Sequence, residues 1–373
     1  MKEIKTVGIV GFGVMGSAIG LNAASSGYRV IFKELNDELV RVMYDKWVIK
    51  SLSKRVKKGK ITQDDMDKIK SMITGTSKYE DMADCDLVIE AALEDMDLKI
   101  KLFADLSSVC RKDAIIVSNT STFLIEKLME KVDNQERTAG LHYFFPANIN
   151  RLVEVIRQKN TSDETYDALI NFAKKNRKTA ITVKDFPGFA INPIFIASYM
   201  VLDSFYGQKY NVATLEDISK KALNVKFGIM WVQNGSGVGT CFHAGASMIK
   251  YLSNTVIGYP KMPDALKERL NAGPWNLEDG PILVNEEACN KVKDRLLGTI
   301  FVVASHLIEQ DVVTTSDLEL GIRTALAWPK GPFSMMNEIG MEEAARLVKS
   351  SVDAGDFKLP RKFASQDMSP WPL

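Results

Sequence analysis

Short apolar runs alternate with helix-compatible stretches through the first half of the chain. Residues 4–10 (IKTVGIV) form one such run, and residues 14–25 fit a helix that Gly27 ends. The same pattern predicts further strands at residues 28–33, 86–90, 114–118, 138–143, 152–156 and 180–183. Because helical stretches separate most of these continuous apolar runs, we expect an α/β fold with a parallel sheet covered on both faces.

The pattern changes after the turn signal Asp185-Phe-Pro-Gly188, where strand-like runs become scarce. We therefore expect a first domain over residues 1–185 and an all-helical domain over residues 186–373. Within the second domain, residues 214–237 and 317–340 align without gaps at an offset of 103. This similarity predicts a duplicated domain with two weak repeats, about residues 186–250 and 293–350, and chance similarity between amphipathic helices is the alternative.

Composition narrows the class of protein. The 373 residues include 48 Lys and Arg and 47 Asp and Glu, for a net charge of +1, which argues against whole-surface binding of nucleic acid or acidic membrane. The start of the chain lacks the layout of a signal peptide and no apolar run suits a membrane span, so we expect a cytoplasmic protein. The four cysteines form no cluster with histidine, which predicts reduced thiols and no metal site.

The first strand, turn and helix carry the pattern Gly11-x-Gly13-x-x-Gly16. In this context the pattern is typical of a Rossmann-type dinucleotide site. Gly11 permits a tight turn, Gly13 lets the backbone approach a pyrophosphate, and Gly16 lets the helix pack close to the strand. The start of the helix, at Val14 and Met15, would then hold the phosphates, and a glycine turn without a ligand is the alternative.

An acidic residue follows the next predicted strand. Glu34 lies 23 residues after Gly11, where a carboxylate can bind the hydroxyls of the adenosine ribose. The same carboxylate would repel the 2′-phosphate of NADP, so the predicted cofactor is NAD. Lys33 is the neighbouring cation that could turn toward a phosphate instead.

Two residues on neighbouring predicted strands suit proton transfer. His142 ends an apolar run, at the edge where open α/β sheets bind ligands, and histidine changes its charge near neutral pH. Glu154 interrupts the apolar run LVEVI, where a buried carboxylate needs a partner. The pair therefore predicts an acid/base and the carboxylate that orients it. The alternatives are a core histidine and a sheet-edge carboxylate in water, and we expect His243 and His306 to be structural.

Several motifs in register resemble a known family. The segments GxGxxG, DLVIEAALED, SNTST, GLHYFFP, LVEVI and DFPGFAIN, in this order and spacing, resemble the L-3-hydroxyacyl-CoA dehydrogenase family, related to 3-hydroxybutyryl-CoA dehydrogenases. The resemblance is strong through residues 4–206 and looser beyond. It implies NAD-dependent oxidation of a (S)-3-hydroxyacyl-CoA to a 3-ketoacyl-CoA, or the reverse, in fatty-acid β-oxidation or short-chain acyl-CoA metabolism. The alternatives are a dehydrogenase of a free 3-hydroxy acid and a dinucleotide-binding protein without catalysis.

The resemblance also implies roles for individual residues. His142 and Glu154 would be the catalytic dyad, while Ser118 would hydrogen-bond the C3 oxygen of the substrate and Asn192 would complete the polar pocket. Glu94 and Lys99 would lie near the nicotinamide-side ribose. Taken singly, Ser118 also fits a strand end and Asn192 a helix cap or a packing position. Glu94 and Lys99 also fit a solvated ion pair on a helix.

A local charge bias fits the same resemblance. Residues 46–60 hold seven basic side chains and no acidic one, and the family binds the nucleotide end of coenzyme A near this region, so Ser51, Lys57 and Lys58 are candidate contacts. A solvated helix face is equally compatible with this run. The sequence departs from the family at Phe145, where an asparagine is usual, and at Pro193, where an arginine is usual. The helical domain would form a homodimer, or its two repeats would pair within a monomer.

Overall fold

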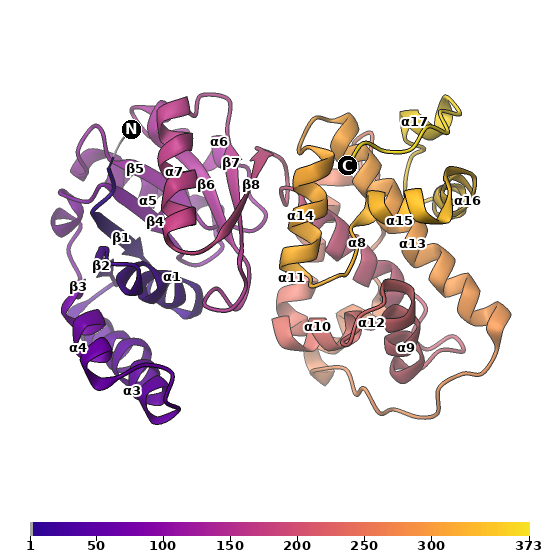
Figure 1. Ribbon diagram of the computed structural model, residues 1–373, viewed down its shortest axis with the longest axis horizontal. Helices are drawn as coiled ribbons and strands as arrows, with labels where there is room; N and C mark the ends of the chain where they lie inside the picture. Colours follow the sequence, from indigo (N-terminus) through magenta and orange to yellow (C-terminus); the bar gives the residue numbers. More distant parts are fainter. Residues whose placement is uncertain (1–2) are drawn as a thin grey trace. The chain divides into compact units, whose positions relative to one another are not determined.

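The chain folds into two compact units with the division between Asp185 and Phe186 (Figure 1). The computed structural model describes residues 3–373. No helix over these residues is long and apolar enough to cross a membrane.

The first unit is built on one sheet. Over residues 3–185 its strands follow the order β3-β2-β1-β4-β5-β6-β7-β8. Their bounds are β1 (Thr6–Val10), β2 (Arg29–Lys33), β3 (Ile73–Thr76), β4 (Leu87–Glu90), β5 (Ile115–Ser118), β6 (Thr138–Tyr143), β7 (Leu152–Arg157) and β8 (Thr179–Lys184). The helices are α1 (Val14–Ser25), α2 (Asp37–Met43), the π-helix η1 (Tyr44–Ile49), α3 (Lys50–Lys57), α4 (Gln63–Ser71), the 3₁₀ turn η2 (Glu80–Met82), α5 (Met96–Val109), α6 (Ile125–Leu128), the 3₁₀ turn η3 (Gln135–Arg137) and α7 (Asp163–Lys175).

The sheet departs from the predicted parallel arrangement at one pair of strands. β6 and β7 are antiparallel, whereas every other neighbouring pair over residues 3–185 is parallel. Residues 144–151 join them, and this connection is shorter than the dozen or so residues that a parallel crossover needs. The edge strand β3 was not expected, because its sequence ITGT lacks a continuous apolar run.

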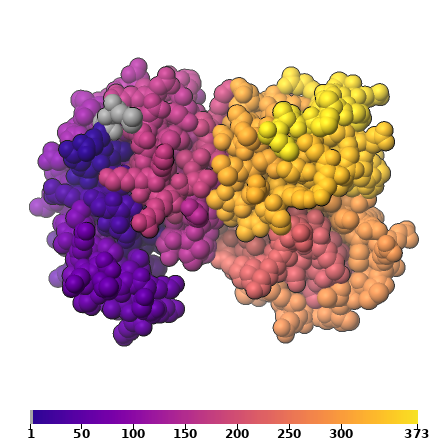
Figure 2. Space-filling view, in the orientation of Figure 1, coloured from indigo at the N-terminus to yellow at the C-terminus, as the bar shows by residue number. Residues whose placement is uncertain are grey.

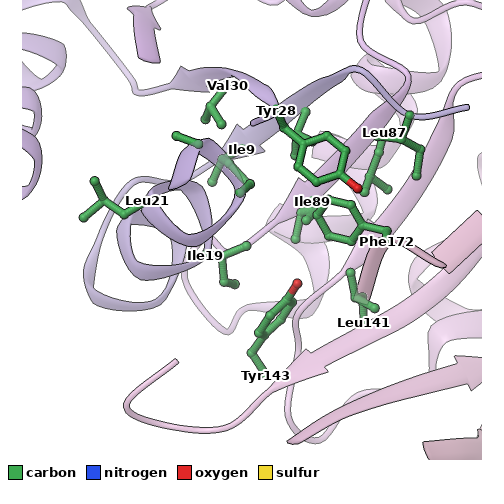
Figure 3. Packing of buried hydrophobic residues seen from close by; sticks show 14 of the residues in the cluster. Ile9, Ile19, Leu21, Tyr28, Val30, Leu87, Ile89, Leu141, Tyr143 and Phe172 are labelled. Carbon is green, nitrogen blue, oxygen red and sulfur yellow. The ribbon is translucent and has the colours of Figure 1, made fainter. Parts of the chain in front are cut away.

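The apolar strand residues form the core of the first unit. Ile9, Ile89 and Leu141 are fully buried in β1, β4 and β6. Figure 3 shows them beside Ile19 of α1 and Phe172 of α7. The first and the last helix of this unit therefore pack on the same core. Burial of each such side chain stabilises the fold by roughly 1.5–3 kcal/mol. The predicted α/β class is confirmed, because these continuous apolar strands need helices to shield them from water.

All regular elements of the second unit are helices over residues 186–373. They are α8 (Ile191–Asp203), α9 (Val212–Leu223), α10 (Ile229–Ser236), α11 (Val238–Leu252), α12 (Asp264–Ala272), α13 (Glu286–Glu309), α14 (Thr315–Ala325), α15 (Pro332–Ile339), α16 (Met341–Asp353) and α17 (Arg361–Ala364). The helix starts of α9, α10 and α11 recur 103 residues later in α14, α15 and α16.

Two glutamates make the same contact in the two halves of this unit. Glu216 of α9 accepts a hydrogen bond from the Gly228 N–H at the start of α10, at 2.7 Å. Glu319 of α14 accepts one from the Gly331 N–H at the start of α15, at 3.1 Å. A carboxylate at the positive end of a helix satisfies N–H groups that have no partner inside the helix. The shared contact therefore links one helix to the next in both halves.

An asparagine in each half also repeats its contacts. The Asn234 side chain donates to the Trp275 carbonyl oxygen at 2.8 Å and accepts from the Trp275 N–H at 2.7 Å. Asn337 makes the same two bonds to Trp371, at 2.9 and 2.8 Å. These repeated contacts support our proposal that the helical unit arose by internal duplication.

We expect Glu319→Ala to destabilise the helical unit by about 2–3 kcal/mol, because the carboxylate is buried and also accepts from the Phe333 and Ser334 N–H groups. Urea unfolding followed by tryptophan fluorescence measures the change. Glu268→Ala, at an exposed position inside α12, is the matched control and should shift stability by less than about 0.5 kcal/mol. Equal shifts in the two variants would contradict the capping role.

Candidate functional site

The glycine loop between β1 and α1 has no room for side chains at two of its glycines. Gly11 takes a φ of +86°, and a Cβ there would lie 2.8 Å from the Ala91 carbonyl oxygen. A Cβ on Gly16 would lie 1.9 Å from the Gly11 carbonyl oxygen. At Gly13, the N-cap of α1, a Cβ would meet nothing within 4 Å. Open space beside Gly13 is what a dinucleotide pyrophosphate requires, so these residues fit the predicted cofactor.

Glu34 lies directly beside this loop. It follows β2, and its Oε1 accepts a hydrogen bond from the Phe12 N–H at 2.6 Å. Lys33 is buried, its Nζ lies 4.2 Å from the centroid of the Tyr79 ring, and burial lowers its pKa. The carboxylate therefore borders the glycine loop, while the neighbouring cation packs against an aromatic ring.

His142 and Glu154 face one another across β6 and β7. They are opposite residues in the antiparallel register, and His142 Nδ1 lies 2.6 Å from Glu154 Oε2. Both side chains are buried, so the water-exposed alternative for Glu154 is wrong. A carboxylate at Nδ1 fixes the imidazole tautomer and leaves Nε2 to exchange a proton. The Phe144 ring, whose centroid is 4.5 Å from that of His142, packs against the imidazole.

A second group of buried polar residues lies at the ends of the neighbouring strands β4 and β5. Its central residue, Glu90, was not predicted from the sequence. Glu90, the last residue of β4, is fully buried and lies opposite Ser118, the last residue of β5. The Ser118 hydroxyl donates to Glu90 Oε2 at 2.5 Å, and the Lys99 ammonium forms an ion pair with Glu90 Oε1. The sequence signal that indicated Glu154 is also present for Glu90, because a carboxylate ends the apolar run DLVIE and needs a partner if it is buried.

Glu94 joins this group from the turn before α5. Its Oε2 lies 3.2 Å from the Lys99 ammonium, and its Oε1 accepts hydrogen bonds from the Thr120 hydroxyl and the Ser121 N–H. Lys99 is only 1% exposed, so the alternative of a solvated ion pair on a helix is wrong for Lys99. The structure therefore gathers Glu94, Lys99 and Ser118 into one cluster.

The register of the sheet brings this cluster close to the histidine. Ser118 pairs with Gly140 in β5 and β6, so His142 lies two residues further along the adjacent strand. The carboxyl ends of β1, β2, β4 and β5 therefore carry the glycine loop, Glu34, Glu90 and Ser118 along one edge of the sheet.

The remaining predicted residues lie elsewhere. Asn192 is half-buried in the first turn of α8, in the helical unit. Ser51 is half-buried in α3, and Lys57 and Lys58 are exposed at the end of that helix. Phe145, which follows the histidine strand, is 52% exposed.

Helices α3 and α4 form a pair near the β3 edge of the sheet (Figure 1). In Figure 2 this violet segment stands out from the rest of the first unit as a lobe. The basic run 46–60 begins in η1 and continues through α3 to the turn before α4.

Among residues 3–373, no group of three or more His, Cys, Asp or Glu side chains is arranged to hold a metal ion. Cys85, Cys110, Cys241 and Cys289 are free thiols.

The fold and this edge of the sheet define a dinucleotide-binding protein with a buried histidine–carboxylate pair. Residues 6–186 match the family model of the 3-hydroxyacyl-CoA dehydrogenase NAD binding domain. A probable 3-hydroxyacyl-CoA dehydrogenase of Caenorhabditis elegans is 39% identical over 215 residues, which cover 55% of this chain and 70% of the relative. The chain belongs to the 3-hydroxyacyl-CoA dehydrogenase family, as its motifs indicated, and its predicted cofactor, NAD, is confirmed.

Two further comparisons cover different lengths. The glyoxysomal fatty acid beta-oxidation multifunctional protein MFP-a of Brassica napus is 39% identical over 194 residues, or 52% of this chain. The chain spans only 27% of the length of that relative. A crystal structure of 3-hydroxybutyryl-CoA dehydrogenase from Escherichia coli K12 has a TM-score of 0.81 at 19% identity and covers 98% of both chains. At that identity the likeness establishes the fold, including the helical half.

Two glycine variants should separate cofactor contact from loop packing. We expect Gly13→Ala to keep the wild-type melting temperature and to weaken NADH binding at least tenfold, because the added methyl occupies only the open space of the cradle. Gly16→Ala should lower both the melting temperature and the NADH affinity, because its methyl clashes with the Gly11 carbonyl oxygen inside the protein. Fluorescence titration with NADH and thermal unfolding measure the two effects, and unchanged NADH affinity in Gly13→Ala would remove the cradle from the cofactor site.

Proposed function

We propose that the protein catalyses NAD-dependent oxidation of a (S)-3-hydroxyacyl-CoA to the 3-ketoacyl-CoA, or the reverse reduction, in fatty-acid or short-chain acyl-CoA metabolism. The observation that carries the proposal is the 2.6 Å contact between buried His142 and Glu154, beside the strand ends that lead to the cofactor cradle. A buried acid/base pair argues against a dinucleotide-binding protein without catalysis.

The chemistry follows from the positions of these side chains. When held at the glycine loop and Glu34, NAD would supply the acceptor for the hydride that leaves C3 of the substrate. His142 Nε2 takes the hydroxyl proton of the substrate, since Nδ1 faces Glu154. The Glu154 carboxylate stabilises the imidazolium that forms, and in the reverse direction the charged histidine is the acid. We propose that Ser118 and Asn192 contact the C3 oxygen and that Glu94 and Lys99 bind the nicotinamide-side ribose.

We expect His142→Gln to lower kcat by about 10²–10⁴-fold and to leave NADH affinity within twofold of wild type, because the variant loses proton transfer and keeps the glycine loop. Glu154→Gln should lower kcat at least tenfold. NADH absorbance is followed with acetoacetyl-CoA, longer 3-ketoacyl-CoAs and free 3-hydroxy acids.

His243→Gln, at an exposed position of α11, is the matched control and should keep wild-type kcat. Turnover of free 3-hydroxy acids without turnover of any CoA thioester would replace the proposed substrate class. Equal loss of turnover and NADH binding in His142→Gln would make that histidine structural.

The basic run 46–60 supports a CoA thioester over a free 3-hydroxy acid. We propose that Lys57, Lys58 and Ser51 contact the phosphorylated nucleotide end of coenzyme A. Both lysines are exposed at the end of α3, where no acidic residue is present in the run 46–60. Such a local positive surface attracts an anionic ligand even though the whole chain is nearly neutral.

We expect the double variant Lys57→Ala/Lys58→Ala to raise the KM for acetoacetyl-CoA by about tenfold at low ionic strength and less at high salt, which screens exposed charges. The KM for acetoacetyl-pantetheine, which lacks the nucleotide, should stay unchanged. Lys174→Ala/Lys175→Ala removes two exposed lysines from the end of α7 and is the matched control. An equal rise of KM for both substrates would contradict nucleotide contact.

The helical unit bears on the oligomeric state. We propose that its two similar halves pair within one chain, so that the protein is a monomer with an internal pseudo-dimer and needs no second copy. The packing of α8, in the first half, against α13, which begins the second, supports this proposal. A cytoplasmic location stays a prediction, and some relatives are named as peroxisomal or glyoxysomal proteins.

A further inference from the structure

The buried carboxylate of Glu90 is surrounded by donors on both oxygens. Its Oε1 forms an ion pair with the Lys99 ammonium and accepts a hydrogen bond from the Ala92 N–H at 2.7 Å. Its Oε2 receives the Ser118 hydroxyl at 2.5 Å. As an ionised group with a cation as its partner, Glu90 accepts hydrogen bonds and donates none. The single hydroxyl proton of Ser118 therefore points at Glu90.

The other bonding positions of the Ser118 oxygen follow from this assignment. The Thr120 N–H donates to Ser118 Oγ at 3.1 Å and occupies one of its two lone pairs. A serine hydroxyl offers one proton and two lone pairs, so one lone pair remains for a ligand. In this arrangement Ser118 can accept a hydrogen bond from a substrate hydroxyl and has no proton for a ketone oxygen.

We propose that Glu90 is a positioning residue that makes Ser118 an acceptor toward the substrate, so that the site favours the 3-hydroxy form over the 3-keto form. The inference rests on the proposed function, since it takes Ser118 to face the C3 oxygen. A protonated His142 donates a hydrogen bond to the C3 oxygen of either form. The alcohol then gives its single proton to Ser118, whereas the ketone has no proton to give. An acceptor facing the ketone oxygen is repulsive, which adds to the difference.

Glu90→Gln reverses the polarity of Ser118 with little change of shape. The amide oxygen must face the Lys99 ammonium and the Ala92 N–H, because both are donors. The amide NH₂ then faces Ser118 and donates to its oxygen. With that position taken, the Ser118 proton turns away from residue 90 and becomes available to a ketone oxygen.

The test measures binding in abortive complexes, where no turnover occurs. Isothermal titration gives the Kd of acetoacetyl-CoA with saturating NAD⁺ and that of (S)-3-hydroxybutyryl-CoA with saturating NADH. We expect Glu90→Gln to lower the ratio of the keto Kd to the hydroxy Kd by about tenfold, the effect of one hydrogen bond gained or lost. Ser118→Ala should lower the same ratio several-fold, because only the alcohol loses a partner, and this variant tests the inference where Glu90→Gln fails to fold.

Asp86→Asn is the matched control. Asp86 is the carboxylate next to the opposite end of β4, where it accepts from the Lys5 and Thr6 N–H groups, and its variant should leave the ratio within twofold. Equal weakening of both ligands by Glu90→Gln would make Glu90 merely structural, and weaker keto binding alone in Ser118→Ala would make Ser118 a donor. Either result overturns the inference and leaves the proposed function standing. If the wild type binds neither thioester, the proposed function fails and the inference falls with it.

Discussion

Carboxylates buried within the sheet impose the main physical constraint on the first unit. An ionised group removed from water destabilises a fold by several kcal/mol unless charges and hydrogen bonds compensate it. Glu90 and Glu154 are both fully buried, and each has a specific partner on an adjacent element. The strands that carry them cannot shift by one residue without separating these pairs, so the register of the sheet and the geometry of the candidate site are one property.

The antiparallel pair of β6 and β7 shows how this constraint produces chemistry. Opposite residues in an antiparallel pair place their side chains on the same face of the sheet. His142 and Glu154 are such opposite residues, and the short connection between the strands makes their pairing local. An imidazole held by a buried carboxylate is restricted to one tautomer, which prepares Nε2 for proton transfer. The strand reversal that departs from the parallel pattern is therefore what assembles the acid/base pair.

The helical unit uses the same kind of interaction for stability. Glu216 and Glu319 each place a carboxylate at the start of the next helix, where unpaired N–H groups and the helix dipole favour negative charge. Such a contact joins two successive helices through a side chain. The same solution appears in both halves of the unit, although few other residues coincide.

The sequence by itself determined the α/β class, the helical second half, the glycine loop with Glu34, and the pairing of His142 with Glu154. Those features depend on local periodicity, on glycine geometry, and on the free energy of burying a single carboxylate, and all three are readable along the chain. Only the tertiary structure decided the antiparallel strand pair, the burial of Lys99, and the contact of Ser118 with Glu90. The physical reason is that strand order and register decide which hydrogen-bond partners far apart in sequence come together. The direction of the Ser118 hydroxyl proton depends on all the donors around the Glu90 carboxylate.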